Sequence, residues 1–242
     1  MNYHWNWGIF WDASPEGAGT YADMLIGGLR ITLAVSALAW MIALTTGSAV
    51  GVLRSLPNPW VKRLANAYIE LLRNIPLLVQ LFLWYFVLPE IVPEAWGDWL
   101  KSLRDAPFYT AVIGLGLFMS ARVAVQVSTG IAALPRGQMA AGLALGLTLP
   151  QTYRYVILPN AFRVILPPLT SETINTIKNS SVALTIGLAE LTARARAIQE
   201  FSFQVFEAFT AATLIYLVIN MIATLLMRML ERRMRIPGYG AK

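Results

Sequence analysis

Polar side chains recur at helical spacing within an apolar stretch between residues 164 and 188. Five of them fall at relative positions 0, 3, 4, 7 and 8, on one helical face: Glu172, Asn175, Thr176, Asn179 and Ser180. Lys178 lies off this face. A polar stripe against lipid is costly, so we expect it to face protein or water. Hydrogen bonding between helices is one interpretation. The wall of a pathway for a polar solute is the other, and five polar groups favour it.

A second cluster lies in another apolar stretch, where Arg122 and Gln126 are four residues apart and share a helical face. No acidic residue lies within one turn of Arg122. A guanidinium at that depth needs a partner from another helix, water or an anionic ligand. Contact with a substrate carboxylate and a structural ion pair with Glu172 both stay open. The charged residues considered within the apolar stretches are four basic and two acidic: Arg30, Glu70, Arg73, Arg122, Glu172 and Lys178. This excess of positive charge weakly favours an anionic solute.

Glu70 and Arg73 are three residues apart, and this spacing predicts an ion pair between them. Pro76 follows closely. Because proline lacks an N–H, a bend is expected at this point.

The sequence offers no constellation for covalent chemistry. It contains no cysteine and a single histidine, His4, which argues against thiolate nucleophiles, Ser-His-Asp catalysis and clustered metal ligands. The sequence contains neither the phosphate-binding loop pattern G-x-x-x-x-G-K-S/T nor the dinucleotide-binding pattern G-x-G-x-x-G. We therefore expect no enzyme activity, and no cofactor or metal on this chain. If the protein belongs to an energised machine, its nucleotide site lies on a partner.

The composition places these residues in a membrane. The chain has 242 residues, of which 57% are hydrophobic and 13% charged, against roughly 25% charged in soluble domains. A spanning helix needs about 20 mostly apolar residues. An all-α polytopic membrane protein is predicted, with five spans at about 24–53, 64–88, 108–133, 164–188 and 209–230.

Positive charges predict the orientation. The segments before the first span and after the second and fourth spans hold four Lys or Arg residues, whereas the alternate segments hold eleven when Arg228, at the end of the fifth span, is counted with the tail. Basic residues concentrate on the cytoplasmic side. The expected organisation is a periplasmic or interfacial segment 1–23, a permease-like domain 24–230 with a cytoplasmic loop 134–163, and a cytoplasmic tail 231–242.

The loop 134–163 contains a short helix candidate, Gln138–Leu149, bounded by Gly137 and Pro150. It is too apolar for a free loop helix, so a docking element for a partner is expected. A helix lying on the membrane surface is the alternative. Gly146 is expected to permit close approach of a partner surface, because glycine has no Cβ.

This loop resembles the EAA loop of bacterial ABC importer permeases. Ala140, Ala141 and Gly142 occupy the three positions that give the loop its name, with Ala140 in place of the glutamate and Gly142 in place of the last alanine. The rest of the pattern is met by Gly146, Val156, Leu158 and Pro159.

The resemblance extends over nearly the whole chain. The matching stretches include WNWGIF, ELLRNIPLLVQLF, ARVAVQVSTGIAALPRGQ, LPNAFRVILPP and IKNSSVALTIG, all similar to the permease family for polar amino acids (His/Glu/Gln/Arg/opine). The subgroup for glutamate and aspartate is the most similar. The resemblance implies an ATP-driven importer of acidic amino acids with the type I ABC importer permease fold, in the bacterial inner membrane.

It also implies partners. A second, different permease subunit, two copies of an ATPase subunit carrying ATP–Mg and a periplasmic amino-acid-binding protein are expected; no nucleic acid is. By resemblance, Gln138–Leu147 is the coupling helix. The residues expected to couple to the ATPase are Gly137, Gln138, Ala140, Ala141, Gly146, Leu147, Leu158 and Pro159. The residues expected along the substrate pathway are Arg122, Gln126, Glu172, Asn175, Lys178, Asn179 and Ser180. A permease for glutamine and a passive channel are the alternatives.

Overall fold

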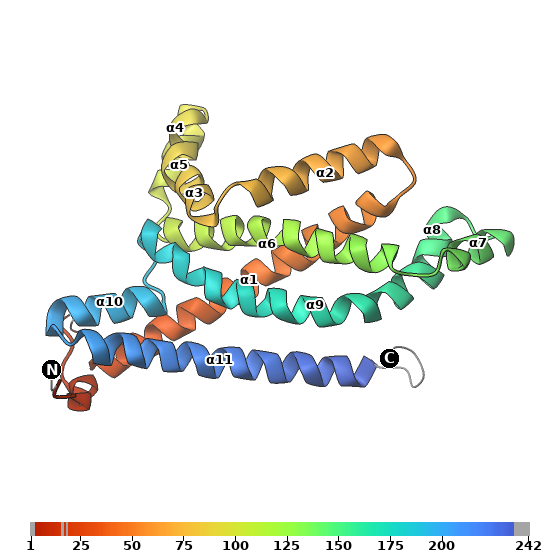
Figure 1. Ribbon diagram of the computed structural model, residues 1–242. Coiled ribbons are helices and arrows are strands. Elements are labelled where there is room, and N and C mark those ends of the chain that lie inside the picture. Colours follow the sequence, from red (N-terminus) through yellow and green to blue (C-terminus); the bar gives the residue numbers. More distant parts are fainter. Residues whose placement is uncertain (1–2, 16, 18, 235–242) are drawn as a thin grey trace. The chain divides into compact units, whose positions relative to one another are not determined.

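The chain folds into helices in the computed structural model, which describes residues 3–15, 17 and 19–234. Over this range no β-strand forms, and one isolated bridge pairs Ala13 with Thr20. In chain order (Figure 1) the elements are a 3-10 turn Trp7–Trp11, α1 Tyr21–Ser55, α2 Pro59–Asn74, α3 Leu77–Phe82, a π-helical turn Leu83–Val87, α4 Leu88–Ile91, α5 Glu94–Ser102, α6 Ala106–Ala132, α7 Arg136–Ala144, α8 Leu149–Thr152, a second π-helical turn Tyr153–Ile157, α9 Leu158–Asn179, a 3-10 segment Ser180–Ile186, α10 Leu191–Ser202 and α11 Val205–Met234.

Three of these helices, α1, α6 and α11, are long and apolar enough to cross a membrane. They cover the first, third and fifth predicted spans. A fourth candidate is the bent pair formed by α2 and the segment Leu77–Ile91, which by length and composition is either one broken span or a re-entrant loop. The break falls at Ile75 and Pro76, as proline predicts, because its ring removes the N–H that would continue the helix. Helix α9 covers much of the fourth predicted span but is not among the candidates, and it carries the polar residues noted above.

Two π-helical turns precede prolines in the same way. The N–H of Leu88 bonds to the carbonyl of Leu83, and the N–H of Leu158 bonds to that of Tyr153, five residues back in each case. The next residue is Pro89 in the first case and Pro159 in the second. A proline has no N–H for a carbonyl four residues earlier, so a widened turn before it redistributes the remaining bonds.

The helices form two compact units. The first unit comprises the described residues of 1–40, 76–116 and 175–222, and the second those of 41–75, 117–174 and 223–234. In the first unit, a core cluster joins the N-terminal segment and α1 to α10 and α11. Its buried members are Ile9, Tyr21, Met24, Leu25, Leu191, Ala195, Ile198, Ala208 and Ala212.

The N-terminal segment packs on this core and is not a disordered tail over residues 3–15. The Tyr3 hydroxyl donates to the Glu207 carboxylate at 2.5 Å, and the Asn6 backbone N–H donates to it at 2.7 Å. This hydrogen bond raises the pKa of Tyr3 to about 12. Trp5 and Trp7 stack at 5.2 Å and stay exposed, which suits a membrane interface.

In the second unit, α1 packs closely on α6 through two glycines. A Cβ at Gly47 would lie 2.5 Å from the Ser120 carbonyl oxygen, and one at Gly51 would lie 2.7 Å from the Val127 Cβ. Small residues four apart let two apolar helices approach at backbone distance. The Tyr68 and Ser120 hydroxyls, 2.7 Å apart, join α2 to the same helix.

Candidate functional site

A charged cluster within the second unit joins α6 to α9. Arg122 Nε donates to Glu172 Oε2 at 2.7 Å and its Nη2 donates to Oε1 at 3.3 Å, while Gln126 Nε2 reaches Oε1 at 3.4 Å. The Glu172 side chain is 6% exposed and that of Arg122 39%. The geometry is that of the structural pair, one of the two interpretations left open by the sequence.

This arrangement compensates a buried carboxylate with three N–H donors. A bidentate contact between a guanidinium and a carboxylate is a strong and directional form of ion pair. The pair has no net charge, so it creates no anion-binding centre while it is closed. The pair uses the Nε and Nη2 donors of Arg122, so contact with a substrate carboxylate would have to use Nη1 or displace Glu172.

The remaining predicted pathway residues belong to the first unit. Asn175, Lys178 and Asn179 lie in the last turns of α9, and Ser180 begins the 3-10 segment that follows. Ser180 is buried and donates to the Ile177 carbonyl at 2.8 Å. Lys178 is exposed, and no described carboxylate lies within ion-pair distance of it. Among these groups, the Lys178 ammonium is therefore the one open to an anionic ligand.

The helix expected to couple to the ATPase begins two residues earlier and ends at least three residues earlier than predicted. Helix α7 runs Arg136–Ala144, whereas the resemblance gave Gln138–Leu147 and the breakers gave Gln138–Leu149. Gly146 is the reason. It adopts φ +82°, its N–H donates to Leu143 O at 3.0 Å, and the Leu147 N–H donates to Gly142 O at 3.2 Å. These are the two bonds of a Schellman motif, which ends a helix.

The close approach of a partner surface expected at Gly146 stays a prediction, and the structure adds a second reason for glycine at this position. No atom outside its neighbours lies within 4 Å of a Cβ built there, so nothing in this chain approaches it closely. Glycine is favoured because its backbone is left-handed. Close approach occurs instead at Gly142, where a Cβ would lie 2.7 Å from Thr152 Cγ2. Gly142 thus lets α7 lie directly on α8.

Further hydrogen bonds hold this loop together. Thr148 and Gln151 form a capping box at the start of α8, and Asn160 Nδ2 donates to Gln138 Oε1 at 3.5 Å. Of the predicted coupling residues, Gly137, Ala140, Ala141 and Gly146 are exposed, Gln138 and Leu147 are half-buried, and Leu158 and Pro159 open α9. Leu145 is 82% exposed at the tip, beside exposed Leu143 and Tyr155.

The loop is tied to the end of α1 by residues that the sequence did not single out. The Tyr153 hydroxyl donates to the Ser55 carbonyl at 2.9 Å. Arg54 Nε donates to Asn66 at 2.8 Å and its Nη1 donates to Ser128 at 2.9 Å, linking α1, α2 and α6. Proximity of Arg54 to a span end was visible in the sequence, but its partners are 12 and 74 residues away.

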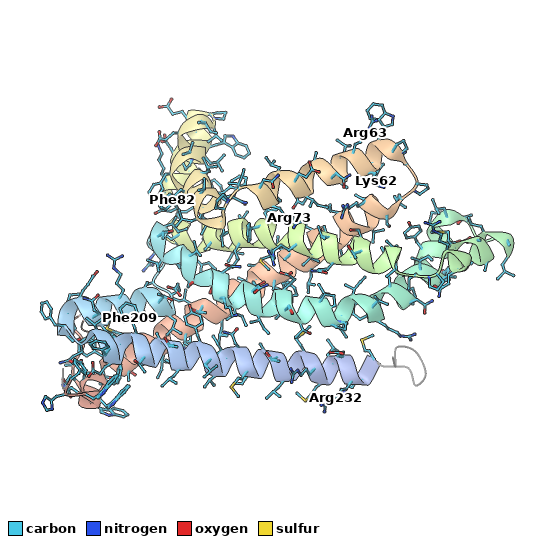
Figure 2. The ribbon with its side chains drawn as sticks, in the orientation of Figure 1. Lys62, Arg63, Arg73, Phe82, Phe209 and Arg232 are labelled. Atoms are coloured by element: carbon cyan, nitrogen blue, oxygen red, sulfur yellow. The ribbon has the colours of Figure 1, made fainter. Side chains whose placement is uncertain are left out.

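The basic residues Lys62 and Arg63 lie in the first turns of α2 and Arg73 in its last (Figure 2). Glu70 and Arg73 are both exposed and form no ion pair with each other. The pairing predicted from their spacing was therefore wrong. Exposed ends of long side chains in water gain little from such contacts.

A buried acid in the first unit was also missed. Glu190 caps α10 by accepting from the Ala193 N–H at 2.8 Å, and it accepts from the Tyr216 hydroxyl at 2.8 Å. Burial raises the pKa of Glu190, and the hydrogen bonds partly oppose that rise. Because Glu190 lies in a connection between apolar stretches, the sequence predicted a charged residue outside the spans but did not predict its burial. No group of three or more His, Asp or Glu side chains in the described part of the chain could hold a metal ion.

Comparisons with known proteins agree over nearly the whole length. Residues 43–236 match the family described as the inner membrane component of binding-protein-dependent transport systems. The chain is 48% identical over 241 residues to the glutamate/aspartate import permease protein GltJ of Escherichia coli K12, covering 98% of both chains. It is 35% identical over 231 residues to the glutamine transport system permease protein GlnP of the same organism, covering 96% of this chain and 98% of that one.

The fold agrees with a solved transporter. A crystal structure of an amino acid ABC transporter with histidines superposes with a TM-score of 0.76 at 34% identity, over 88% of this chain and 95% of that one. An inward-facing structure of the MetNI methionine ABC transporter has a TM-score of 0.73 at 18% identity, which shows the fold alone. The chain therefore belongs to the family of inner membrane permease components of binding-protein-dependent ABC transporters, a transport subunit and not an enzyme.

Proposed function

We propose that this chain is the permease subunit of an ATP-driven importer for glutamate and aspartate. The observation that carries the proposal is its 48% identity, over 98% of both chains, to a glutamate/aspartate import permease. Glutamine is the second candidate substrate, because the chain is also 35% identical to a glutamine permease.

The proposed topology has five spans, with the N-terminus in the periplasm and the C-terminus in the cytoplasm. Three apolar helices and one broken pair support four of the spans. Helix α9 is the remaining span; it buries Glu172 and Thr176 and leaves Lys178 exposed. The excess of basic residues in alternate connections supports the orientation. The segment 1–23 is then periplasmic or interfacial. The tail 231–242 is cytoplasmic, and its residues 235–242, with part of the ERRMRIPG stretch, lie outside the described chain.

The proposed assembly contains this chain, a different permease subunit, two ATPase subunits carrying ATP–Mg and a periplasmic amino-acid-binding protein. Helix α7 and the turn after it are the ATPase contact. Their exposed surface is apolar, with Leu143 and Leu145 at its centre. Apolar side chains held on a packed, capped loop suit docking better than a free loop would.

The proposed substrate pathway follows α6, α9 and the 3-10 segment. Within it, Lys178 is the residue proposed to bind a substrate carboxylate, and Asn175, Asn179 and Ser180 offer polar side chains nearby in sequence. Arg122, Gln126 and Glu172 hold α6 against α9 and present a closed pair to the pathway.

The test is reconstitution of the complete transporter with its binding protein, and measurement of ATP-dependent uptake of glutamate, aspartate, glutamine and arginine. We expect glutamate and aspartate to be taken up and arginine not. The variant Lys178→Met should lower uptake of acidic amino acids about tenfold, because it removes one charge-assisted contact with the substrate carboxylate. The variant Lys62→Met should leave uptake unchanged. Uptake of glutamine alone would assign the other substrate, and flux without ATP would indicate a channel.

A further inference from the structure

A cavity of about 610 Å³ lies within the first unit. Its walls come from the π-helical turn after α3, from α4 and α5, and from the first turns of α6. The lining is largely aromatic and apolar, with Trp84, Phe86, Trp99, Leu103, Tyr109 and Ile113 among its members. Cavities that hold small molecules measure about 300–1,000 Å³ and have this character. None of the residues assigned to coupling or to the substrate pathway lines it.

Two opposite charges also line this cavity. Lys101 Nζ lies 2.8 Å from Glu90 Oε1, with the two side chains 48% and 66% exposed. The hydrogen bond that Lys101 donates to the Glu90 carboxylate raises the pKa of Lys101, so the ammonium stays charged at neutral pH. An ion pair this exposed contributes little to stability. Lys101 and Glu90 can therefore each release the other and bind a charged group of a ligand with little loss of free energy.

The surroundings of the cavity indicate what enters it. The chain is an inner membrane component, and three aromatic side chains that line the cavity are also exposed at the surface: Phe86, Trp99 and Tyr109. Tryptophan and tyrosine favour the depth of lipid headgroups. Between residues 90 and 105 the chain carries four acidic and two basic residues, so an anionic headgroup is disfavoured and one with an added positive charge is favoured.

We propose that this cavity holds an acyl chain of one phospholipid whose headgroup carries both a phosphate and a primary ammonium. The phosphate lies against Lys101 and the ammonium against Glu90, and the chain lies among the aromatic side chains. The lipid is thereby a bound ligand of this subunit, distinct from the lipids that surround its apolar helices.

The test uses the assembled transporter in nanodiscs that contain a trace of phosphatidylethanolamine with a diazirine in its acyl chain. After illumination, peptide mapping counts lipid adducts on residues 99–113 relative to those on the exposed face of α11, which serves as an internal reference. We expect enrichment in the cavity. A matched phosphatidylglycerol probe, which lacks the ammonium, should show none.

Two pairs of variants separate the acyl site from the headgroup site. Ala106→Phe fills the cavity and should abolish the enrichment, whereas Ala37→Phe, on the exposed face of α1, should leave it intact. Lys101→Gln should lower the enrichment up to about fivefold, the scale of one exposed charge contact. Arg104→Gln, in the same connection but outside the cavity lining, should not.

Adducts spread evenly over cavity and reference peptides would overturn the proposal. So would equal labelling by the two probes, or crosslinks showing that a neighbouring subunit fills the cavity. Because adduct formation needs no transport, these outcomes are independent of which amino acid the importer carries.

Discussion

Glu172 is a buried carboxylate that accepts two hydrogen bonds from the Arg122 guanidinium and one from Gln126, both on α6. Replacing Arg122 with methionine removes the two guanidinium donors and the positive charge of the ion pair. Such a loss is strongly destabilising. We expect the amount of permease in the membrane to fall several-fold, as a loss of about 1–2 kcal/mol produces. Immunoblotting of membranes measures it.

The double variant separates pairing from substrate contact. With Arg122→Met and Glu172→Gln together, no charge is stranded, and abundance should return towards the wild-type level. Arg30→Met, at an exposed position of α1, is the control and should not change abundance. If Arg122→Met left abundance normal and abolished uptake alone, the ion pair would not be structural.

Gly146 shapes the coupling loop through its backbone. At φ +82° an alanine is strained by about 1–2 kcal/mol, so Gly146→Ala should loosen the end of α7 and weaken ATPase stimulation by loaded binding protein. Gly146→Asn should retain more stimulation, because asparagine tolerates the left-handed region. Gly27→Ala, where φ is ordinary and space is open in α1, is the control. Equal behaviour of alanine and asparagine would contradict this account.

Glu190 gives the first unit a pH dependence of known sign. Its pKa in the folded protein lies above the ordinary value of 4.5 because burial penalises the ionised form. Its contribution to stability is then fully present below about pH 4.5 and is lost as the pH rises through the folded pKa. Glu190→Gln keeps an oxygen for the Ala193 N–H and removes this loss.

We therefore expect the melting temperature of Glu190→Gln to exceed that of wild type at pH 7–8, with the difference shrinking as the pH falls towards 4.5. Thermal unfolding of the purified complex across this range measures it. Glu200→Gln, at an exposed residue paired with Arg196, should show no such trend. A difference that grows on acidification would reverse the assigned sign.

At the scale of elements, the packing of α1 on α6 depends on two glycines that leave no space for a side chain. Gly51→Leu should cost about 1–3 kcal/mol through overpacking and lower the abundance of the permease. Ala49→Leu adds similar bulk at an exposed position of the same helix and should be tolerated. Comparing the two by membrane immunoblot isolates the contact from any effect of hydrophobicity.

Helices and breaks were predicted correctly where a single sequence feature, such as a long apolar run or a proline, determines the local structure. Long apolar runs gave α1, α6 and α11, and Pro76 gave the break after α2. The end of α7 was misjudged because Gly146 has two possible uses, close approach and a left-handed turn, and composition does not distinguish them. The π-helical turns depend on how the bonds around Pro89 and Pro159 are shared, which spacing rules do not describe.

The site was harder to predict than the elements. Helical periodicity found Arg122, Gln126 and Glu172 but left their pairing open, since the pair joins residues 50 apart. It wrongly paired Glu70 with Arg73, because spacing on one helix brings two exposed side chains within reach of each other but does not require them to meet. The links from Arg54 and Tyr153 needed the tertiary structure, as their partners are distant in sequence.

At the scale of the whole molecule, the proposed orientation can be tested directly because the chain has no cysteine. A single cysteine at Asp98 should react with a membrane-impermeant thiol reagent in intact cells, whereas one at Gln151 should react only after lysis. Both positions are exposed, unlike Ser14, which is buried. The reverse labelling pattern would refute the placement of the N-terminus in the periplasm.

The ion pair between α6 and α9 also has a consequence in time. Arg122 is synthesised 50 residues before Glu172, which at about 5–20 residues per second is a delay of roughly 3–10 s. During that interval α6 reaches the membrane with a guanidinium that lacks its carboxylate, and such a charge resists the lipid interior. We therefore expect α6 to be inserted less stably until α9 has been made, so that a chain terminated between them lacks the carboxylate that compensates Arg122.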